Sequence, residues 1–381
     1  MDKKQGAGAT PSDPKQNGQG GPFKGGKSKP KEEIDVSNYP IQGGYVPPPP
    51  GGVCPPLPGE PPRANYPPGF LYGELPPNAS FNPNVDVDRL YRAMKGIGTR
   101  DSELVDIFGS RTRRERVVIA DLYRQKYGIE LAQAIRSETS GDYRDLILML
   151  LKPLDVLLAE LAHDAVHGAG TKDLQLIDII TQFVGPEMDM MKAAYQRLFG
   201  KSLAKDVEGD TSGSYQKVLL RCIENRRTPI GVVRDVVSAQ VDAVRFYKAG
   251  EGRLGTNEDF YIDALTMYSA EYIQLMSTQY KKSYGCTIIS AIESETSGHF
   301  RDALIALASP RQLHFARRVR NATKGIGTKD RLLIYIFAIL DKPFLKATAA
   351  CFADMYKEPM AKTISGDTYG NYEKLLLALM A

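Results

Sequence analysis

The chain has 381 residues, of which 42% are hydrophobic and 25% charged, with a formal net charge of +4. This composition supports a large buried core, and so small a basic excess does not by itself indicate nucleic acid. No run of about 18 apolar residues is present, and the start MDKKQGAGAT lacks the apolar segment of a signal peptide. We therefore expect a cytoplasmic protein that contacts membranes only from their surface.

The first 84 residues contain 19 of the 25 prolines and 14 of the 35 glycines. This is too much proline and glycine for packed secondary structure. We predict a disordered tail over residues 1–84, with polyproline II segments such as PPPPGG.

Helical patterns follow the tail. Residues 85–94 have apolar side chains at helical spacing, and the next helix starts after Thr99, which we expect to cap it. A third helix ends at Gly128, and two shorter helices follow before Pro153. No segment shows the alternation of a strand, so the predicted class is all-α.

The segment KGIGTRD, residues 95–101, returns as HGAGTKD, GRLGTNED and KGIGTKD. The glycine before each threonine stands at positions 98, 170, 255 and 327, at intervals of 72, 85 and 72 residues. The chain therefore contains four repeats of about five helices. We place them at residues 85–153, 154–228, 229–309 and 310–381, and the longer middle interval, around 224–253, suggests a linker between two halves.

An acidic residue stands 40 residues after the glycine in every repeat: Glu138, Asp210, Glu295 and Asp367. Each acid lies in a polar turn that can fold back beside the glycine loop. One such loop or turn alone is usually a helix stop or a helix start. Capping does not explain a fixed spacing in four copies, so the pair favours a metal site.

Calcium suits such a pair because it takes six to eight hard oxygen ligands and accepts backbone carbonyls readily. Glycines let a short loop turn several carbonyls inward. Three carbonyls and a bidentate carboxylate supply about five oxygens, which leaves about two positions, one of them for a lipid phosphate. Calcium and lipid would then strengthen each other's binding.

The loops also carry residues suited to a membrane surface. The residue inside each loop is apolar, and basic residues flank the loops, where they would face anionic headgroups. The apolar set is Ile97, Ala169, Leu254 and Ile326, and the basic set is Lys95, Arg100, Lys172, Arg253, Lys324 and Lys329.

These motifs resemble annexin repeats, and the resemblance covers about residues 85–381. It implies a slightly curved disc of four five-helix repeats, whose convex face carries calcium loops that bind anionic phospholipid, chiefly phosphatidylserine. The implied function is reversible, calcium-dependent binding to membranes in their organisation or trafficking. The protein would be cytoplasmic and would become peripheral on membranes when calcium rises.

The resemblance also implies the calcium ligands, three carbonyls and one carboxylate for each site. The four sets are Met94, Gly96, Gly98 and Glu138; Val166, Gly168, Gly170 and Asp210; Gly250, Arg253, Gly255 and Glu295; and Thr323, Gly325, Gly327 and Asp367. The third loop is one residue longer than the others, as the family's third loop often is.

The chain departs from the family pattern at its centre. Where many annexins pair an arginine with an aspartate across a central channel, this chain has Phe183 and Leu158. We expect apolar packing there, which gives no support to ion conduction. In the tail, YPPGF at residues 66–70 is similar to motifs read by penta-EF-hand proteins. Such tails bind partner proteins or self-associate.

The sequence favours three other functions less. Catalysis is not expected, because no HExxH, G-x-S-x-G or Walker motif is present. Nucleic-acid binding is not expected either, since the tail lacks an arginine-rich or aromatic-interleaved composition. The main alternative is a helical scaffold with vestigial loops, which should have lost acids or glycines. All four acids and their glycines are present.

Overall fold

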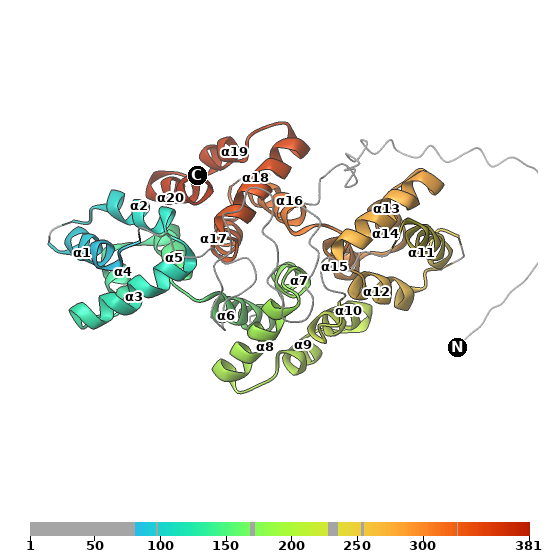
Figure 1. The fold of residues 1–381 in the computed structure, drawn as a ribbon, viewed down its shortest axis with the longest axis horizontal. Helices are drawn as coiled ribbons and strands as arrows, with labels where there is room; N and C mark the ends of the chain where they lie inside the picture. Colours follow the sequence, from blue (N-terminus) through green and yellow to red (C-terminus); the bar gives the residue numbers. More distant parts are fainter. Residues whose placement is uncertain (1–80, 97, 168–171, 228–234, 253–254, 326) are drawn as a thin grey trace, which may run out of the picture. The chain divides into compact units, whose positions relative to one another are not determined.

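The computed structural model describes residues 81–381 except 97, 168–171, 228–234, 253–254 and 326. This part of the chain contains twenty α-helices and no strand (Figure 1). The predicted all-α class is confirmed. The tail predicted over residues 1–84 lies almost entirely outside the described residues, and so does YPPGF.

Each repeat contains five helices. In the first they are α1 (Pro83–Met94), α2 (Asp101–Ser110), α3 (Arg113–Tyr127), α4 (Leu131–Glu138) and α5 (Gly141–Leu150). In the second they are α6 (Leu154–Val166), α7 (Asp173–Gln182), α8 (Pro186–Phe199), α9 (Leu203–Asp210) and α10 (Gly213–Ile223).

The last two repeats follow the same order. The third contains α11 (Val236–Ala249), α12 (Glu258–Met267), α13 (Ala270–Tyr284), α14 (Ile288–Glu295) and α15 (Gly298–Leu307). The fourth contains α16 (Arg311–Thr323), α17 (Asp330–Ile339), α18 (Lys342–Tyr356), α19 (Met360–Asp367) and α20 (Gly370–Met380).

Local chemistry explains two differences from the predicted boundaries. The first helix begins inside the predicted tail, at Pro83, because Asn82 caps it and proline suits the first helical turn. The segment suggested as a linker is partly helical, since α11 starts at Val236 with Asp235 as its cap. The side-chain carboxylate of Asp235 accepts a hydrogen bond from the amide of Ser238 at 2.7 Å.

The third helix of each repeat ends in the left-handed conformation. Gly128, Gly200 and Gly285 take φ near 70–80° there, as expected for a glycine stop. In the fourth repeat Lys357 adopts φ 56° at the same position, a conformation that L-residues other than glycine adopt less readily.

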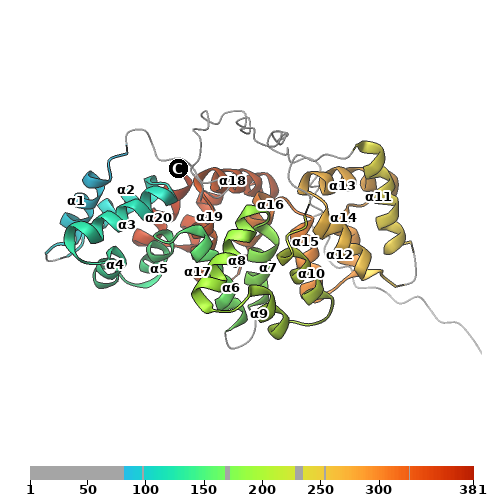
Figure 2. The same cartoon turned by 60° about the horizontal axis from the view of Figure 1, so that its bottom comes forward.

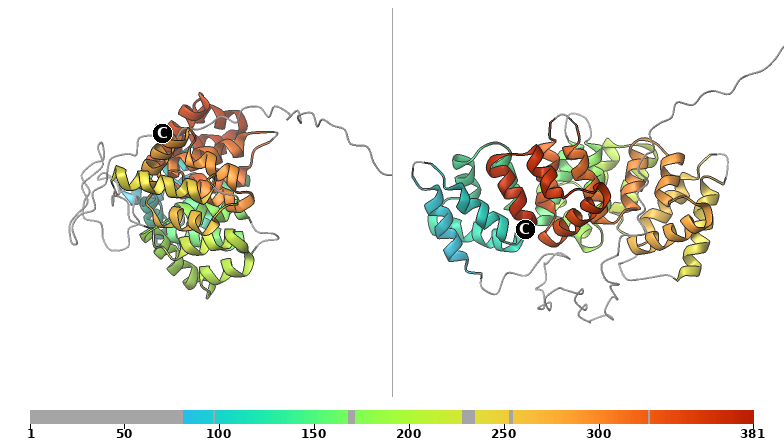
Figure 3. Two further views of the ribbon diagram at one scale, coloured as in Figure 1. Left: turned by 90° about the vertical axis from the view of Figure 1, so that its right-hand side faces the viewer. Right: turned by 90° about the horizontal axis from the view of Figure 1, so that it is seen from above.

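Repeats far apart in sequence pack together. Helix α2 lies along α20, and α5 along α17, so the first repeat contacts the fourth (Figures 1 and 2). Figure 3 shows the same neighbours, with red helices of repeat 4 beside blue-green helices of repeat 1. The second repeat contacts the third in the same way, through α7 with α15 and α10 with α12.

The closest approach between α2 and α20 depends on a glycine. A Cβ atom at Gly109 would lie 2.5 Å from the Cβ of Ala378, closer than two such atoms can stand. The interface between repeats 1 and 4 therefore accepts only glycine at this position without rearrangement.

The substitution Gly109→Ala should destabilise the protein by about 1–3 kcal/mol, because it overpacks this interface. Denaturant unfolding followed by circular dichroism measures the change. Gly366→Ala is the matched control, since this helical glycine has no atom within 4 Å of a new Cβ. That change should be stabilising by a few tenths of a kcal/mol through helix propensity. Equal effects from both variants would rule out the steric explanation.

The contact between repeats 2 and 4 contains a buried charge network. Asp178 of α7 accepts from Nε of Arg318 at 2.8 Å and lies 2.6 Å from Nε2 of His314, both on α16. The hydroxyl of Tyr335 on α17 also donates to this carboxylate. All four side chains are buried.

This network was not predicted from the sequence. Phe183 and Leu158 are fully buried, as expected of apolar packing. Charges nevertheless remain between repeats 2 and 4, in Asp178 and Arg318. A second ion pair, from Arg311 to Glu187, also joins these two repeats.

Among the described helices, none is long and apolar enough to cross a membrane. The three cysteines within the described ranges, Cys222, Cys286 and Cys351, form no disulfide.

Candidate metal centre

Each glycine loop is closed by one backbone hydrogen bond. The amide of the residue after the threonine donates to a carbonyl in the last turn of the preceding helix, at 2.7–3.0 Å. The four pairs are Arg100 with Ala93, Lys172 with Ala165, Asn257 with Ala249, and Lys329 with Ala322. The third loop contains one residue more than the others, and the closing bond is kept.

The threonine of the motif joins the loop to the acid. The hydroxyl of Thr99 donates to Oε2 of Glu138 at 2.9 Å and to its backbone carbonyl at 3.1 Å. The hydroxyl of Thr256 makes the same two bonds to Glu295, at 2.7 and 3.1 Å. Thr328 donates to the carbonyl of Asp367 at 2.7 Å.

Thr99 was expected to cap α2, and that expectation is wrong. The cap position belongs to Arg100, which makes no side-chain capping bond. The threonine hydroxyl is drawn away from the helix because the acid at the end of α4 is a charged acceptor, and charged acceptors form stronger hydrogen bonds.

Glycine is required in these loops by backbone conformation. Gly96 and Gly98 have φ of 114° and 81°, and Gly325 and Gly327 have 122° and 81°, values that favour glycine. A Cβ at any of these four positions would meet nothing within 4 Å, so space does not exclude a side chain. The exposed peptide groups can therefore turn their carbonyls toward a cation.

The third site is built differently. Gly250 is buried with φ −125°, and a Cβ there would lie 3.1 Å from Cγ of Glu295 and 2.1 Å from the hydroxyl of Tyr261. The start of the loop thus lies directly against the acid that follows it 45 residues later in the chain. Glycine is required here by lack of space.

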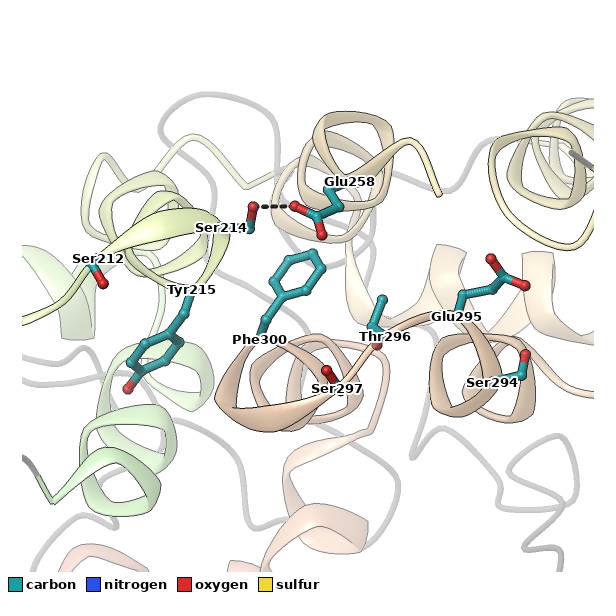
Figure 4. Close-up of a pocket in the computed structure, with 9 residues that line it drawn as sticks. All are labelled: Ser212, Ser214, Tyr215, Glu258, Ser294, Glu295, Thr296, Ser297 and Phe300. Atoms are coloured by element: carbon teal, nitrogen blue, oxygen red, sulfur yellow. Dashed lines mark hydrogen bonds between the residues drawn. The ribbon is translucent and has the colours of Figure 1, made fainter. Parts of the chain in front are cut away.

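An open cavity of about 580 Å³ adjoins the third site, between α10, α12 and α15 (Figure 4). Six hydroxyl side chains line it, together with Glu258, Glu295 and Phe300. Figure 4 shows Glu258 bound to Ser214 across the junction of repeats 2 and 3, with Glu295 at the edge.

The structure brings together loop and acid in three of the four predicted ligand sets. In the first and fourth, the side chains of Met94 and Thr323 are buried and anchor the loop, while the glycines are exposed. In the third, Gly250 and Gly255 are described and Arg253 is not. In the second, Val166 is buried and Asp210 exposed, but Gly168 and Gly170 lie outside the described residues.

Some of the predicted membrane-facing residues lie within the described ranges and others lie outside them. The apolar residues Ile97, Ala169, Leu254 and Ile326 all fall outside the described ranges. Of the basic set, Lys95, Arg100, Lys324 and Lys329 are exposed. Lys172 is half-buried and pairs with Asp164 at 2.8 Å.

The donor set fits a hard cation. In the described ranges, no three His, Cys, Asp or Glu side chains gather as metal ligands. A cation in these loops would therefore rest mainly on carbonyls, with one carboxylate, as calcium accepts.

The tether can be tested in the absence of metal. Thr99→Val should be destabilising by about 1–2 kcal/mol, because it removes a half-buried hydrogen bond to a carboxylate. Thermal unfolding in chelator measures this loss. Ser137→Ala removes an exposed hydrogen bond to the carbonyl of Ala134 within α4, and this control should change stability little. Equal stability of Thr99→Val and the parent chain would contradict the tether.

Comparisons with known proteins give the same picture as the fold. The annexin family model matches residues 85–150, 158–221, 241–307 and 314–379. Annexin A13 of Mus musculus is 34% identical over 79% of this chain and 95% of its own. Annexin A7 of Homo sapiens is 33% identical over 81% of this chain and 64% of its own.

Solved structures agree. A structure titled annexin III superposes with a TM-score of 0.73 at 32% identity, covering 80% of this chain and 95% of its own. A structure titled calcium-bound annexin (Sm)1 gives a TM-score of 0.72 at 29% identity, covering 80% and 92%.

The fold and the repeated loops thus define an all-helical protein of four homologous repeats. The chain belongs to the annexin family. That family is known for calcium-dependent phospholipid binding.

Proposed function

We propose that this annexin binds anionic phospholipid membranes reversibly when calcium occupies its glycine loops, and that it acts by binding and not by catalysis. The observation that carries the proposal is the threonine tether, in which a loop threonine donates to the acidic residue 39 positions later. The bond reaches the carboxylate in repeats 1 and 3 and the backbone carbonyl of Asp367 in repeat 4. The solved calcium-bound relative supports calcium as the cation. Lipid phosphate would fill the ligand positions that the protein leaves open.

Co-sedimentation of the full chain with vesicles tests this function. Vesicles of phosphatidylserine and phosphatidylcholine, or of phosphatidylcholine alone, are each combined with calcium or with chelator. We expect pelleting only with calcium and phosphatidylserine, and release by chelator. A chain that stays in the supernatant under all conditions would favour the alternative, a helical scaffold whose loops bind no lipid.

The proposal also specifies the lipid, the location of the protein and its partners. Phosphatidylserine is the lipid expected, and the protein would be cytoplasmic until calcium rises. The tail would recruit a protein partner, and bound copies would self-associate on the membrane.

A further inference from the structure

One buried position separates the third repeat from the others. Six residues after the glycine that precedes the threonine of each loop, three repeats have a fully buried leucine: Leu104, Leu176 and Leu333. The third repeat places Tyr261 there, also with no exposed surface. Its ring stacks on Phe246 with centroids 4.1 Å apart.

The hydroxyl of Tyr261 is buried and has no hydrogen-bond partner among the residues that the structure describes. Leaving a hydroxyl out of water without a partner is unfavourable. Buried polar groups almost always have partners, so an exception calls for an explanation in another state of the protein.

The hydroxyl lies where the third site is assembled. The clash it would make with a Cβ at Gly250 places it against the start of the loop, and the same Cβ would approach Cγ of Glu295. Burial first, and then the carboxylates of Glu295 and Glu251, raise the pKa of Tyr261. A tyrosine hydroxyl can donate one hydrogen bond, and the carboxylates of Glu295 and Glu251 are charged acceptors in its surroundings.

Glu295 already accepts from Thr256 through Oε2. A carboxylate that ligates a cation needs a fixed orientation, and Thr256 is its one side-chain donor among the described residues. A second donor beneath it would hold the carboxylate in its ligand orientation, in the way that outer hydrogen bonds commonly orient metal ligands.

We propose that Tyr261 is a positioning residue of the third cation site, whose hydroxyl donates to Glu295 when the cation is bound and has no partner when it is absent. The inference rests on the proposed function, because it needs the third loop to bind calcium. The inference predicts that loss of the hydroxyl changes stability and calcium affinity in opposite directions. Without the hydroxyl, the cation-free protein should gain stability and the third site should lose affinity.

The test uses the full chain with Glu138→Gln, Asp210→Asn and Asp367→Asn, which leaves the acid of the third loop alone intact. Calorimetry measures calcium affinity, and thermal unfolding in chelator measures stability. Adding Tyr261→Phe should weaken calcium binding roughly tenfold, as loss of a hydrogen bond to a charged group would. It should also raise Tm by about 2 °C.

Tyr372→Phe is the matched control. Tyr372 is also buried, and its hydroxyl likewise has no partner in the described part of the chain, but it belongs to the fourth repeat. This variant should raise Tm similarly and leave calcium affinity unchanged.

The possible results distinguish failure of the role of Tyr261 from failure of the proposed function. Unchanged calcium affinity in Tyr261→Phe would overturn the inference and leave the proposed function standing. A fall in both Tm and affinity would reduce Tyr261 to a packing role and overturn it too. No calcium binding in the background chain would overturn the third site, and the inference with it.

Discussion

A chain carrying Glu138→Gln, Asp210→Asn, Glu295→Gln and Asp367→Asn should stay in the supernatant at calcium concentrations that sediment the parent chain with phosphatidylserine vesicles. Each change removes the one carboxylate of a loop and leaves the carbonyls in place. Because several weak sites on one molecule multiply their effect, apparent vesicle affinity should fall by about 10²-fold or more.

Helix content by circular dichroism should remain that of the parent, since the four acids are the last residues of their helices. The control must match the change in net charge. Asp121→Asn, Glu130→Gln, Asp189→Asn and Asp263→Asn remove four acids that are more than half exposed. This control should sediment like the parent. Calcium-dependent sedimentation of the four-site variant would refute the proposed ligand set.

Because the motifs recur four times, much of this fold could be predicted from the sequence. Four glycine loops at intervals of 72, 85 and 72 residues imply four copies of one helical unit, and a fixed glycine-to-acid spacing implies that the two meet in each copy. The structure joins them through Thr99, Thr256 and Thr328. A spacing indicates that two groups are neighbours, but it does not indicate which bond holds them, so the sequence alone predicts a helix cap at Thr99.

Features found in one repeat only were not predictable in this way. Asp178 meets His314 and Arg318 across 136 and 140 residues of chain, and no spacing repeats that could reveal the contact. Tyr261 stands where other repeats have leucine, and a sequence shows a tyrosine there without showing that its hydroxyl is buried. Such contacts depend on how whole repeats pack, which local patterns do not encode.

The Asp178 network leads to the second large effect. Asp178→Asn should be destabilising by about 3–5 kcal/mol at neutral pH, because Arg318 is left buried without its counter-charge. Urea unfolding followed by circular dichroism measures this loss. Replacing the three side chains together, in Asp178→Leu, His314→Leu and Arg318→Met, should be less damaging than the single change, since an apolar set of similar size leaves neither Asp178 nor Arg318 as an unpaired charge.

Asp178 should also affect how the stability of the protein changes in acid. Burial alone would raise the pKa of Asp178, but Arg318 and hydrogen bonds from His314 and Tyr335 outweigh it and hold the pKa below its ordinary value. A carboxyl with a lowered pKa in the folded state stabilises the protein above its unfolded pKa, near 4, and loses that contribution as pH falls through the folded pKa.

The difference in unfolding free energy between the parent chain and Asp178→Asn should therefore be constant from about pH 7 to pH 5 and shrink below about pH 4. Urea unfolding at a series of pH values measures that difference directly. A difference that stayed constant down to pH 3 would mean that the carboxylate charge does not stabilise the contact between repeats 2 and 4. The hydrogen bonds alone would then account for the loss, because asparagine cannot accept from Arg318 and Tyr335 as a carboxylate does.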